Sequence, residues 1–190
     1  MTQPSIRGAV FLTGMMGAGK STVGRELARL RGAVFVDLDV RIERIAGRLI
    51  AEVFAADGEA GFRRLEHAAL RSLLAEPGYV DVDSVVATGG GVVVDRRNRE
   101  LMRSAGRVVH LVVPLDELLR RLQAPAQLAA RPLLAARSLR ESVAARLAQR
   151  EPLYKTAELC IDASEEPHLV AARILEELSC ARTHSPKELA

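Results

Sequence analysis

Residues 14 to 21 read Gly-Met-Met-Gly-Ala-Gly-Lys-Ser and have the residue types and spacing of a phosphate-binding loop, G-x-x-x-x-G-K-S. The glycines let backbone N–H groups approach a phosphate chain closely. Lys20 can reach the β- and γ-phosphates of a nucleotide, and the Ser21 hydroxyl is placed to bind Mg²⁺. A glycine-rich turn without a ligand is the alternative interpretation. The residues expected to bind the nucleotide are Gly17, Ala18, Gly19, Lys20, Ser21 and Thr22.

Two aspartates, Asp37 and Asp39, end an apolar run that should form the second strand of a parallel sheet. The carboxyl ends of parallel strands face the crevice in which ligands bind, so both carboxylates should lie beside the phosphate loop. Strand alternation would turn them to the same side. Asp37 could hold Mg²⁺ through water, and Asp39 could orient or deprotonate an acceptor hydroxyl. The alternative is that both aspartates cap a helix.

Arginines at three places could hold an anion, because a guanidinium binds carboxylates and phosphates in bidentate fashion. Arg63 and Glu66 are three residues apart and share a face if their segment is helical, so the glutamate can fix the guanidinium. Arg131 lies where a lid would close on the transferring phosphoryl group. Arg150 ends a predicted helix. In isolation, these would be interpreted as a solvated ion pair and two surface arginines.

Three consecutive glycines, Gly89, Gly90 and Gly91, come straight after an apolar run. A backbone without side chains permits close approach of a small ligand. A simple loop is the competing interpretation.

Short apolar runs alternate with helical segments along the chain, which predicts a parallel sheet covered by helices on both faces. Asp95 is expected to cap a helix that ends at Gly106. The stretch from 123 to 137 has two prolines and repeated alanines, and its place after the fourth strand suggests a lid over the nucleotide. The expected strands are Ala9 to Leu12, Val34 to Val36, Val85 to Ala87, Val108 to Val113, and Leu159 to Ile161.

The composition fits one soluble domain. The chain has 190 residues, 48% of them apolar and only 3% aromatic, so the core must be aliphatic. The net charge is +3, and the arginines are scattered without interleaved aromatic residues, which disfavours nucleic-acid binding. The two cysteines show no metal-ligand spacing, and the four histidines are dispersed. We find neither a signal peptide nor an apolar run near the ~20 residues that cross a bilayer, and we expect a cytoplasmic protein without membrane contact.

Taken in order, the motifs are G-x-x-G-x-G-K-S/T, D-x-D, G-E-x-x-F-R, G-G-G, R-P-L and R-x-P-L-Y. This combination resembles shikimate kinase from about Ile6 to Ser179. The resemblance implies an α/β fold of the P-loop nucleoside-monophosphate-kinase type, a three-layer sandwich with five parallel strands in the order 2-3-1-4-5. We expect one kinase domain over 1–179, with a substrate-binding region at about 39–76 and a lid at about 122–138. The polar stretch 180–190 should be a disordered tail.

The resemblance also implies an activity: a monomer that transfers the γ-phosphoryl group of ATP, with Mg²⁺, to the 3-hydroxyl of shikimate in aromatic amino-acid biosynthesis. Asp39 would bind the substrate hydroxyls and is the candidate base, while Arg63 and Arg150 would hold the carboxylate. Gly90, within Gly89–Gly91, would contact the ring hydroxyls. The remaining expected roles are the pocket lining (Phe54 and Phe62), the metal ligands (Ser21 and Asp37), the catalytic set (Lys20, Asp39 and Arg131), the lid arginine on ATP (Arg131) and the surroundings of adenine (162–167).

The segment between Arg121 and Arg131 departs from the family pattern, because it is longer and more apolar than the usual lid. A lid contact from Arg121 is therefore left open, and altered lid dynamics or nucleotide affinity is predicted.

Two other functions stay open. One is a kinase of the same fold for gluconate or a nucleoside, and the other is a ligand sensor that kept the fold. The motifs of Arg63 and Arg150 favour shikimate, and the few aromatic residues disfavour a nucleoside. The intact phosphate loop and the two aspartates favour phosphoryl transfer over sensing.

Overall fold

The computed structural model describes residues 8–76, 82–123 and 139–180. Its centre is a five-stranded parallel sheet in the order β2-β3-β1-β4-β5. Each predicted run overlaps one strand, and the predicted fold class and strand order are confirmed. The strands are β1 (Ala9–Thr13), β2 (Val34–Asp37), β3 (Ser84–Ala87), β4 (Gly106–Val112) and β5 (Leu159–Asp162).

The central strand β1 is buried along its whole length. A parallel strand covered on both faces needs apolar residues at every position, not only at alternate ones. Its side chains still alternate: Val10 and Leu12 belong to one hydrophobic core, and Ala9 and Phe11 belong to the core on the opposite face. The sheet is therefore the middle layer between two aliphatic cores.

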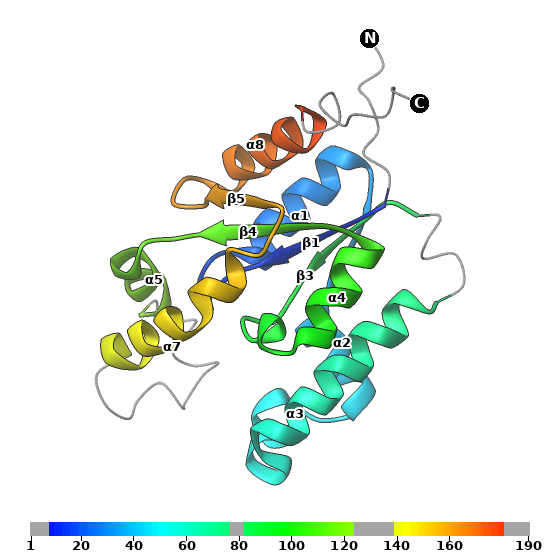
Figure 1. Ribbon diagram of the computed structural model, residues 1–190, viewed down its shortest axis with the longest axis vertical. Helices are drawn as coiled ribbons and strands as arrows, with labels where there is room; N and C mark the ends of the chain where they lie inside the picture. Colours follow the sequence, from blue (N-terminus) through cyan, green and yellow to red (C-terminus); the bar gives the residue numbers. More distant parts are fainter. Residues whose placement is uncertain (1–7, 77–81, 124–138, 181–190) are drawn as a thin grey trace, which may run out of the picture.

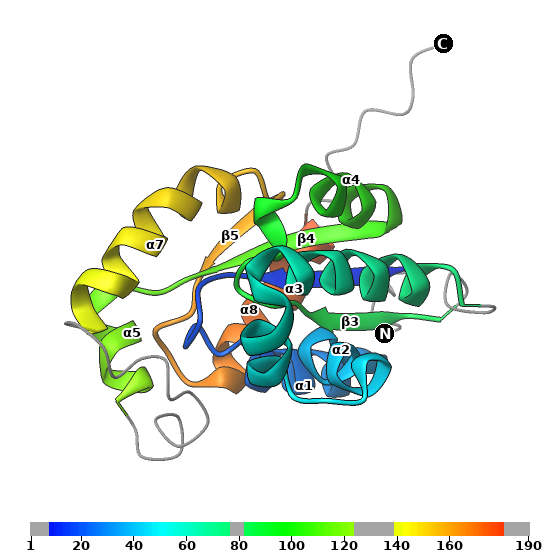
Figure 2. The ribbon, with the colours of Figure 1, turned by 90° about the horizontal axis from the view of Figure 1, so that it is seen from below.

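Helices cover both faces of the sheet, which gives the expected three-layer sandwich (Figure 1). α1 and α8 pack against one core, and α3 and α4 pack against the other. α5 and α7 lie together at one end of the molecule in both views (Figure 2). The helices are α1 (Lys20–Arg31), α2 (Leu38–Ala46), α3 (Ile50–Leu74), the 3₁₀ turn η1 (Val92–Val94), α4 (Arg96–Ala105), α5 (Leu115–Leu122), α7 (Leu139–Tyr154) and α8 (Pro167–Cys180).

A kink divides α3 at Gly58, where φ is 65° and ψ is −175°. Only glycine adopts this conformation readily. The kink brings Phe54 and Phe62 together, with ring centroids 4.6 Å apart, whereas eight residues of straight helix would separate them by about 12 Å. Gly58, the first residue of the G-E-x-x-F-R motif, thus brings together the two phenylalanines that were expected to line the pocket.

Helix α4 begins after Asp95, whose carboxylate accepts a hydrogen bond from the Arg97 backbone N–H, and it ends at Gly106, as predicted. Arg131, nearly all of the lid and residues 181–190 lie outside the described residues. Cys180, expected to begin the tail, is the last residue of α8. Among the described segments, none of the helices has the length and apolar character needed to span a membrane.

Candidate active site

The phosphate loop joins the buried end of β1 to the first turn of α1. Gly19 precedes the helix with φ 86° and ψ 14°, which a side chain would disfavour. Lys20 is 9% exposed, and its ammonium donates to the carbonyls of Gly14, at 2.8 Å, and Met15, at 2.9 Å. The ammonium and the N-terminal end of α1 therefore face the same loop, as an anion site requires. The nucleotide-binding residues predicted in the loop lie here, whereas Arg131, also expected on ATP, lies outside the described residues; those of the loop are Gly17, Ala18, Gly19, Lys20, Ser21 and Thr22.

The two predicted metal ligands are brought together, since the Ser21 hydroxyl donates to Asp37 Oδ2 at 2.6 Å. Asp37 is also the N-cap of α2, because its Oδ1 accepts from the backbone N–H of Asp39 at 3.1 Å. The capping and metal interpretations of Asp37 are thus compatible. Within the described residues, no cluster of three or more His, Cys, Asp or Glu could hold a metal by itself. One hydroxyl and one carboxylate suit Mg²⁺, which takes few protein ligands and completes its shell with water and phosphate.

The argument from strand alternation was wrong for Asp39, because β2 ends at Asp37 and Asp39 lies in the first turn of α2. Its carboxylate still faces the glycine loop. Asp39 Oδ1 lies 2.8 Å from the position that a Cβ on Gly89 would occupy. The residue reaches the expected crevice from a helix, not from a strand.

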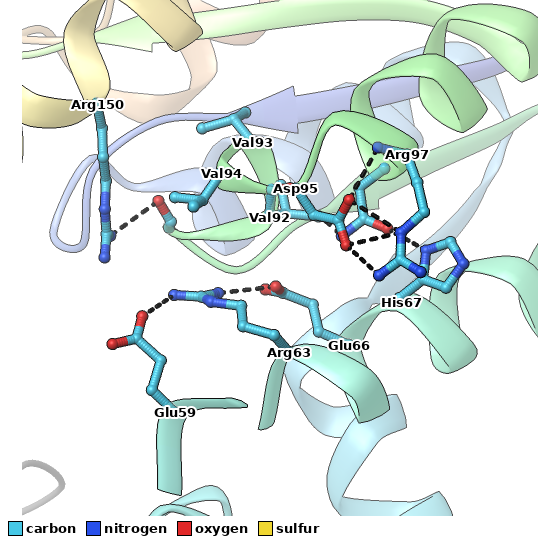
Figure 3. A network of polar contacts seen from close by, with 12 residues as sticks. Glu59, Arg63, Glu66, His67, Val92, Val93, Val94, Asp95, Arg97 and Arg150 are labelled. Atoms are coloured by element: carbon cyan, nitrogen blue, oxygen red, sulfur yellow. Dashed lines mark hydrogen bonds and ion pairs between the residues drawn. The ribbon is translucent and has the colours of Figure 1, made fainter. Parts of the chain in front are cut away.

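Arg63 and Glu66 share one face of α3, and Arg63 Nη1 donates to Glu66 Oε2 at 2.7 Å. The side chain of Glu66 is 0% exposed, so the solvated ion pair is excluded. Burial raises the pKa of Glu66, while the charge and hydrogen bond of Arg63 oppose the rise. Arg63 also donates to Glu59 at 3.0 Å, and its guanidinium lies 5.3 Å from the centre of the Phe62 ring. Figure 3 shows Arg63 held between the two glutamates.

The Gly89–Gly91 segment lies against three parts of the site. A Cβ added at these positions would lie, in order, 3.0 Å from Glu66 Oε1, 3.2 Å from the Met16 backbone nitrogen and in collision with the Arg63 guanidinium. Side chains would fill the space between the phosphate loop and the carboxylates. The backbone of these glycines therefore lines the site, and the interpretation as a simple loop away from any site does not hold.

Arg150 is 8% exposed near the end of α7, and its Nη1 donates to the Gly90 carbonyl at 3.1 Å. It is thus not a surface arginine. Figure 3 shows Arg150 and Arg63 extending toward the same region from α7 and α3. The Nε atoms of both arginines are buried and have no hydrogen-bond partner in the described part of the chain. Two guanidinium groups directed toward one region can bind one carboxylate of a ligand.

Two aromatic residues were not predicted to belong to this site. Tyr154, the last residue of R-x-P-L-Y, donates a hydrogen bond to the Gly90 carbonyl. His110, on β4, stacks on Tyr154 with ring centroids 4.7 Å apart. Because Tyr154 belongs to the same motif as Arg150, the sequence offered a reason to assign Tyr154 to the site as well. A single buried histidine in a strand carries no such signal.

Arg121, whose contact was left open, lies on α5 next to the phosphate loop. Its Nη1 is 3.6 Å from the position of a Cβ on Gly19, and its Nη2 donates to the Ala163 carbonyl at 2.9 Å. It therefore lies beside the phosphate loop and is hydrogen-bonded to the segment 162–167 that was expected near adenine.

A phosphate loop after the central strand, beside a second site of arginines, carboxylates and bare backbone, defines a P-loop kinase that acts on a small molecule. Comparison with known proteins agrees. The shikimate kinase family matches residues 16–179. Shikimate kinase 2 of Dickeya chrysanthemi is 42% identical over 179 residues, which cover 94% of this chain and 97% of the relative. Shikimate kinase of Geobacter sulfurreducens is 47% identical over 162 residues, 85% of each chain.

Among solved structures, shikimate kinase from Acinetobacter baumannii in complex with shikimate superposes with a TM-score of 0.84 at 34% identity. The match covers 95% of this chain and 97% of that one. The chain belongs to the shikimate kinase family, whose members are ATP-dependent kinases.

Proposed function

We propose that this protein transfers the γ-phosphoryl group of ATP to the 3-hydroxyl of shikimate, a step of aromatic amino-acid biosynthesis. The observation that carries the proposal is the convergence of Arg63 and Arg150 on the glycine loop, directly beside the phosphate loop. Shikimate is a small acid with several hydroxyls. Its carboxylate suits the two guanidinium groups, and its hydroxyls suit Asp39 and the backbone of Gly90. The complex of a solved relative with shikimate supports this acceptor.

The chemistry follows from the positions of the charged groups. Lys20 lies inside the phosphate loop and stabilises negative charge on the β- and γ-phosphates. Asp39 orients the acceptor hydroxyl and takes its proton as the oxygen attacks the γ-phosphorus. The bond between that phosphorus and the β,γ-bridging oxygen breaks, and ADP leaves with its electron pair. Phe54 and Phe62 line the acceptor side. Arg131, outside the described residues, is proposed to close on the transferring group.

Mg²⁺ is the cofactor that this site fits. We propose that the Ser21 hydroxyl binds the ion and that Asp37 holds it through water, because the two oxygens already lie 2.6 Å apart at the start of α1. When bound, the ion neutralises charge on the β- and γ-phosphates.

We propose that the protein works as a monomer, as its membership of the shikimate kinase family implies. The reaction needs ATP, which supports the cytoplasm as its compartment.

The test is ADP release by the purified protein with Mg-ATP, alone and with shikimate, gluconate or a nucleoside panel. We expect stimulation by shikimate alone. Arg63→Ala should raise the KM for shikimate at least about tenfold, since hydrogen bonds to charged groups contribute ~1.5–3 kcal/mol. Arg96→Ala is the matched control, because that side chain is 82% exposed on α4. Stimulation by gluconate instead would identify gluconate as the acceptor. Shikimate binding without turnover would support the alternative that the protein is a ligand sensor.

A further inference from the structure

The carbonyl of Gly90 accepts hydrogen bonds from two side chains of α7, Arg150 and Tyr154. These residues are four apart, so they share one face of the helix. The other side of Gly90 touches the phosphate loop: a Cβ there would lie 3.2 Å from the Met16 nitrogen and 3.4 Å from the Gly14 oxygen. One peptide group therefore lies between the phosphate loop and an arginine of the acceptor site.

The Tyr154 side chain is fixed at both its hydroxyl and its ring. It is 1% exposed, so its hydroxyl must find its partner within the protein, and it finds the Gly90 carbonyl. Burial raises the pKa of Tyr154, although the Arg150 charge opposes the rise, and the hydroxyl remains a donor at neutral pH. The ring stacks on His110 with an angle of 8° between the planes.

His110 anchors this stack to the sheet. It lies on β4 opposite Thr13, the last residue of β1 before the phosphate loop. Its Nδ1 is 3.6 Å from the position of a Cβ on Gly14. The phosphate loop, His110, Tyr154 and Gly90 thus form a closed series of neighbouring groups, which we call the circuit.

We propose that Tyr154 is a positioning residue of the acceptor site: supported by the His110 ring, it holds the Gly90 carbonyl where Arg150 also binds, and so aims the guanidinium at the acceptor carboxylate. This assignment rests on the proposed function. A guanidinium carries five N–H donors, and the hydrogen bond from Arg150 Nη1 to the Gly90 carbonyl uses one of them.

The first test is Tyr154→Phe, which removes the hydroxyl and keeps the stacked ring. The KM for shikimate should rise roughly three- to tenfold, the net value of one hydrogen bond, while the KM for ATP changes less than twofold. Thr156→Val is the matched control, since the Thr156 hydroxyl donates to the Leu153 carbonyl at 2.6 Å, outside the circuit. An unchanged shikimate KM, or an equal rise in both KM values, would overturn the assignment.

A double-mutant cycle tests whether Tyr154 acts through Arg150. In the Arg150→Lys background, adding Tyr154→Phe should change the shikimate KM less than twofold. A full three- to tenfold rise in that background would contradict the assignment. His110→Ala should also raise the shikimate KM, and His110→Phe, which restores a stacking ring, should rescue it. Failure of the rescue counts against the supporting role. Native protein that shows no shikimate-dependent turnover would overturn the proposed function itself, and this assignment with it.

Discussion

Glu66 and Arg63 form a buried ion pair in which one carboxylate oxygen accepts from Arg63 Nη1 at 2.7 Å, and the other has no partner in the described chain. The unpartnered oxygen faces the position of a Cβ on Gly89, 3.0 Å away. A buried carboxylate is held in place only by such a partner, because water cannot reach it. Arg63 is consequently fixed by a carboxylate inside the protein, and its guanidinium lies against Gly91.

Glu66→Gln should raise the KM for shikimate by about tenfold, because the ion pair that fixes Arg63 becomes a hydrogen bond from the guanidinium to a neutral amide oxygen. Glu59→Gln is the control, because Glu59 bonds the same guanidinium but is 65% exposed. Exposed pairs contribute ~0–1 kcal/mol, so that variant should change the KM less than about fivefold. Steady-state kinetics give the KM for shikimate of both variants. Equal effects of the two variants would contradict the role of Glu66 in fixing Arg63.

Asp37→Asn should separate the metal role from the capping role. Asparagine caps helices as well as aspartate, so the free energy of unfolding should change by less than about 0.5 kcal/mol. The Mg²⁺ concentration for half-maximal activity should rise roughly 10- to 100-fold, as for other residues that support a metal through a second layer of contacts. Asp95→Asn makes the same exchange at the cap of α4 and should leave the Mg²⁺ requirement unchanged. A titration with Mg²⁺ would refute the metal role if both variants matched the native protein.

His110 should make the protein less stable in acid. Burial lowers the pKa of His110 from 6.5 to about 4, and the nearby Lys20 charge also lowers it. Between these two pKa values the unfolded chain binds a proton that the folded protein does not, so stability falls as the pH falls through that window. Between pH 7.5 and pH 5 this loss is about 2 kcal/mol. Urea unfolding at both pH values should show a smaller loss for His110→Phe, and an identical loss would exclude His110 as its source.

Gly89→Ala should damage the acceptor site through crowding. The new Cβ would lie 2.8 Å from Asp39 Oδ1 and 3.0 Å from Glu66 Oε1, so at least one carboxylate must move. Overpacking of this kind costs ~1–3 kcal/mol, and kcat/KM for shikimate should fall about 10- to 100-fold. Gly47→Ala adds a Cβ in open space at φ 66°, so it should lower stability by ~1 kcal/mol without changing the kinetics. Normal kinetics in Gly89→Ala would show that Asp39 does not act there.

Local patterns in the sequence were sufficient for most of the fold. The apolar runs predicted the five strands, and the motif from Gly14 to Ser21 placed the nucleotide site at the end of the first of them. The spacing of Arg63 and Glu66 predicted their shared helix face. These features depend on residues a few positions apart, whose backbone preferences and side-chain periodicity act over that same range.

The tertiary structure decided what the pattern of residue types left open. Asp39 reached the crevice from a helix because the chain turns at Asp37, one residue after the end of the predicted run. Arg150 looked like a surface residue, and its burial depends on how α7 packs beside the glycine loop. The stack of Tyr154 on His110 joins a helix end to a strand far away in the chain. Contacts between distant segments follow from the packing of the whole chain, so no local stretch of sequence encodes them by itself.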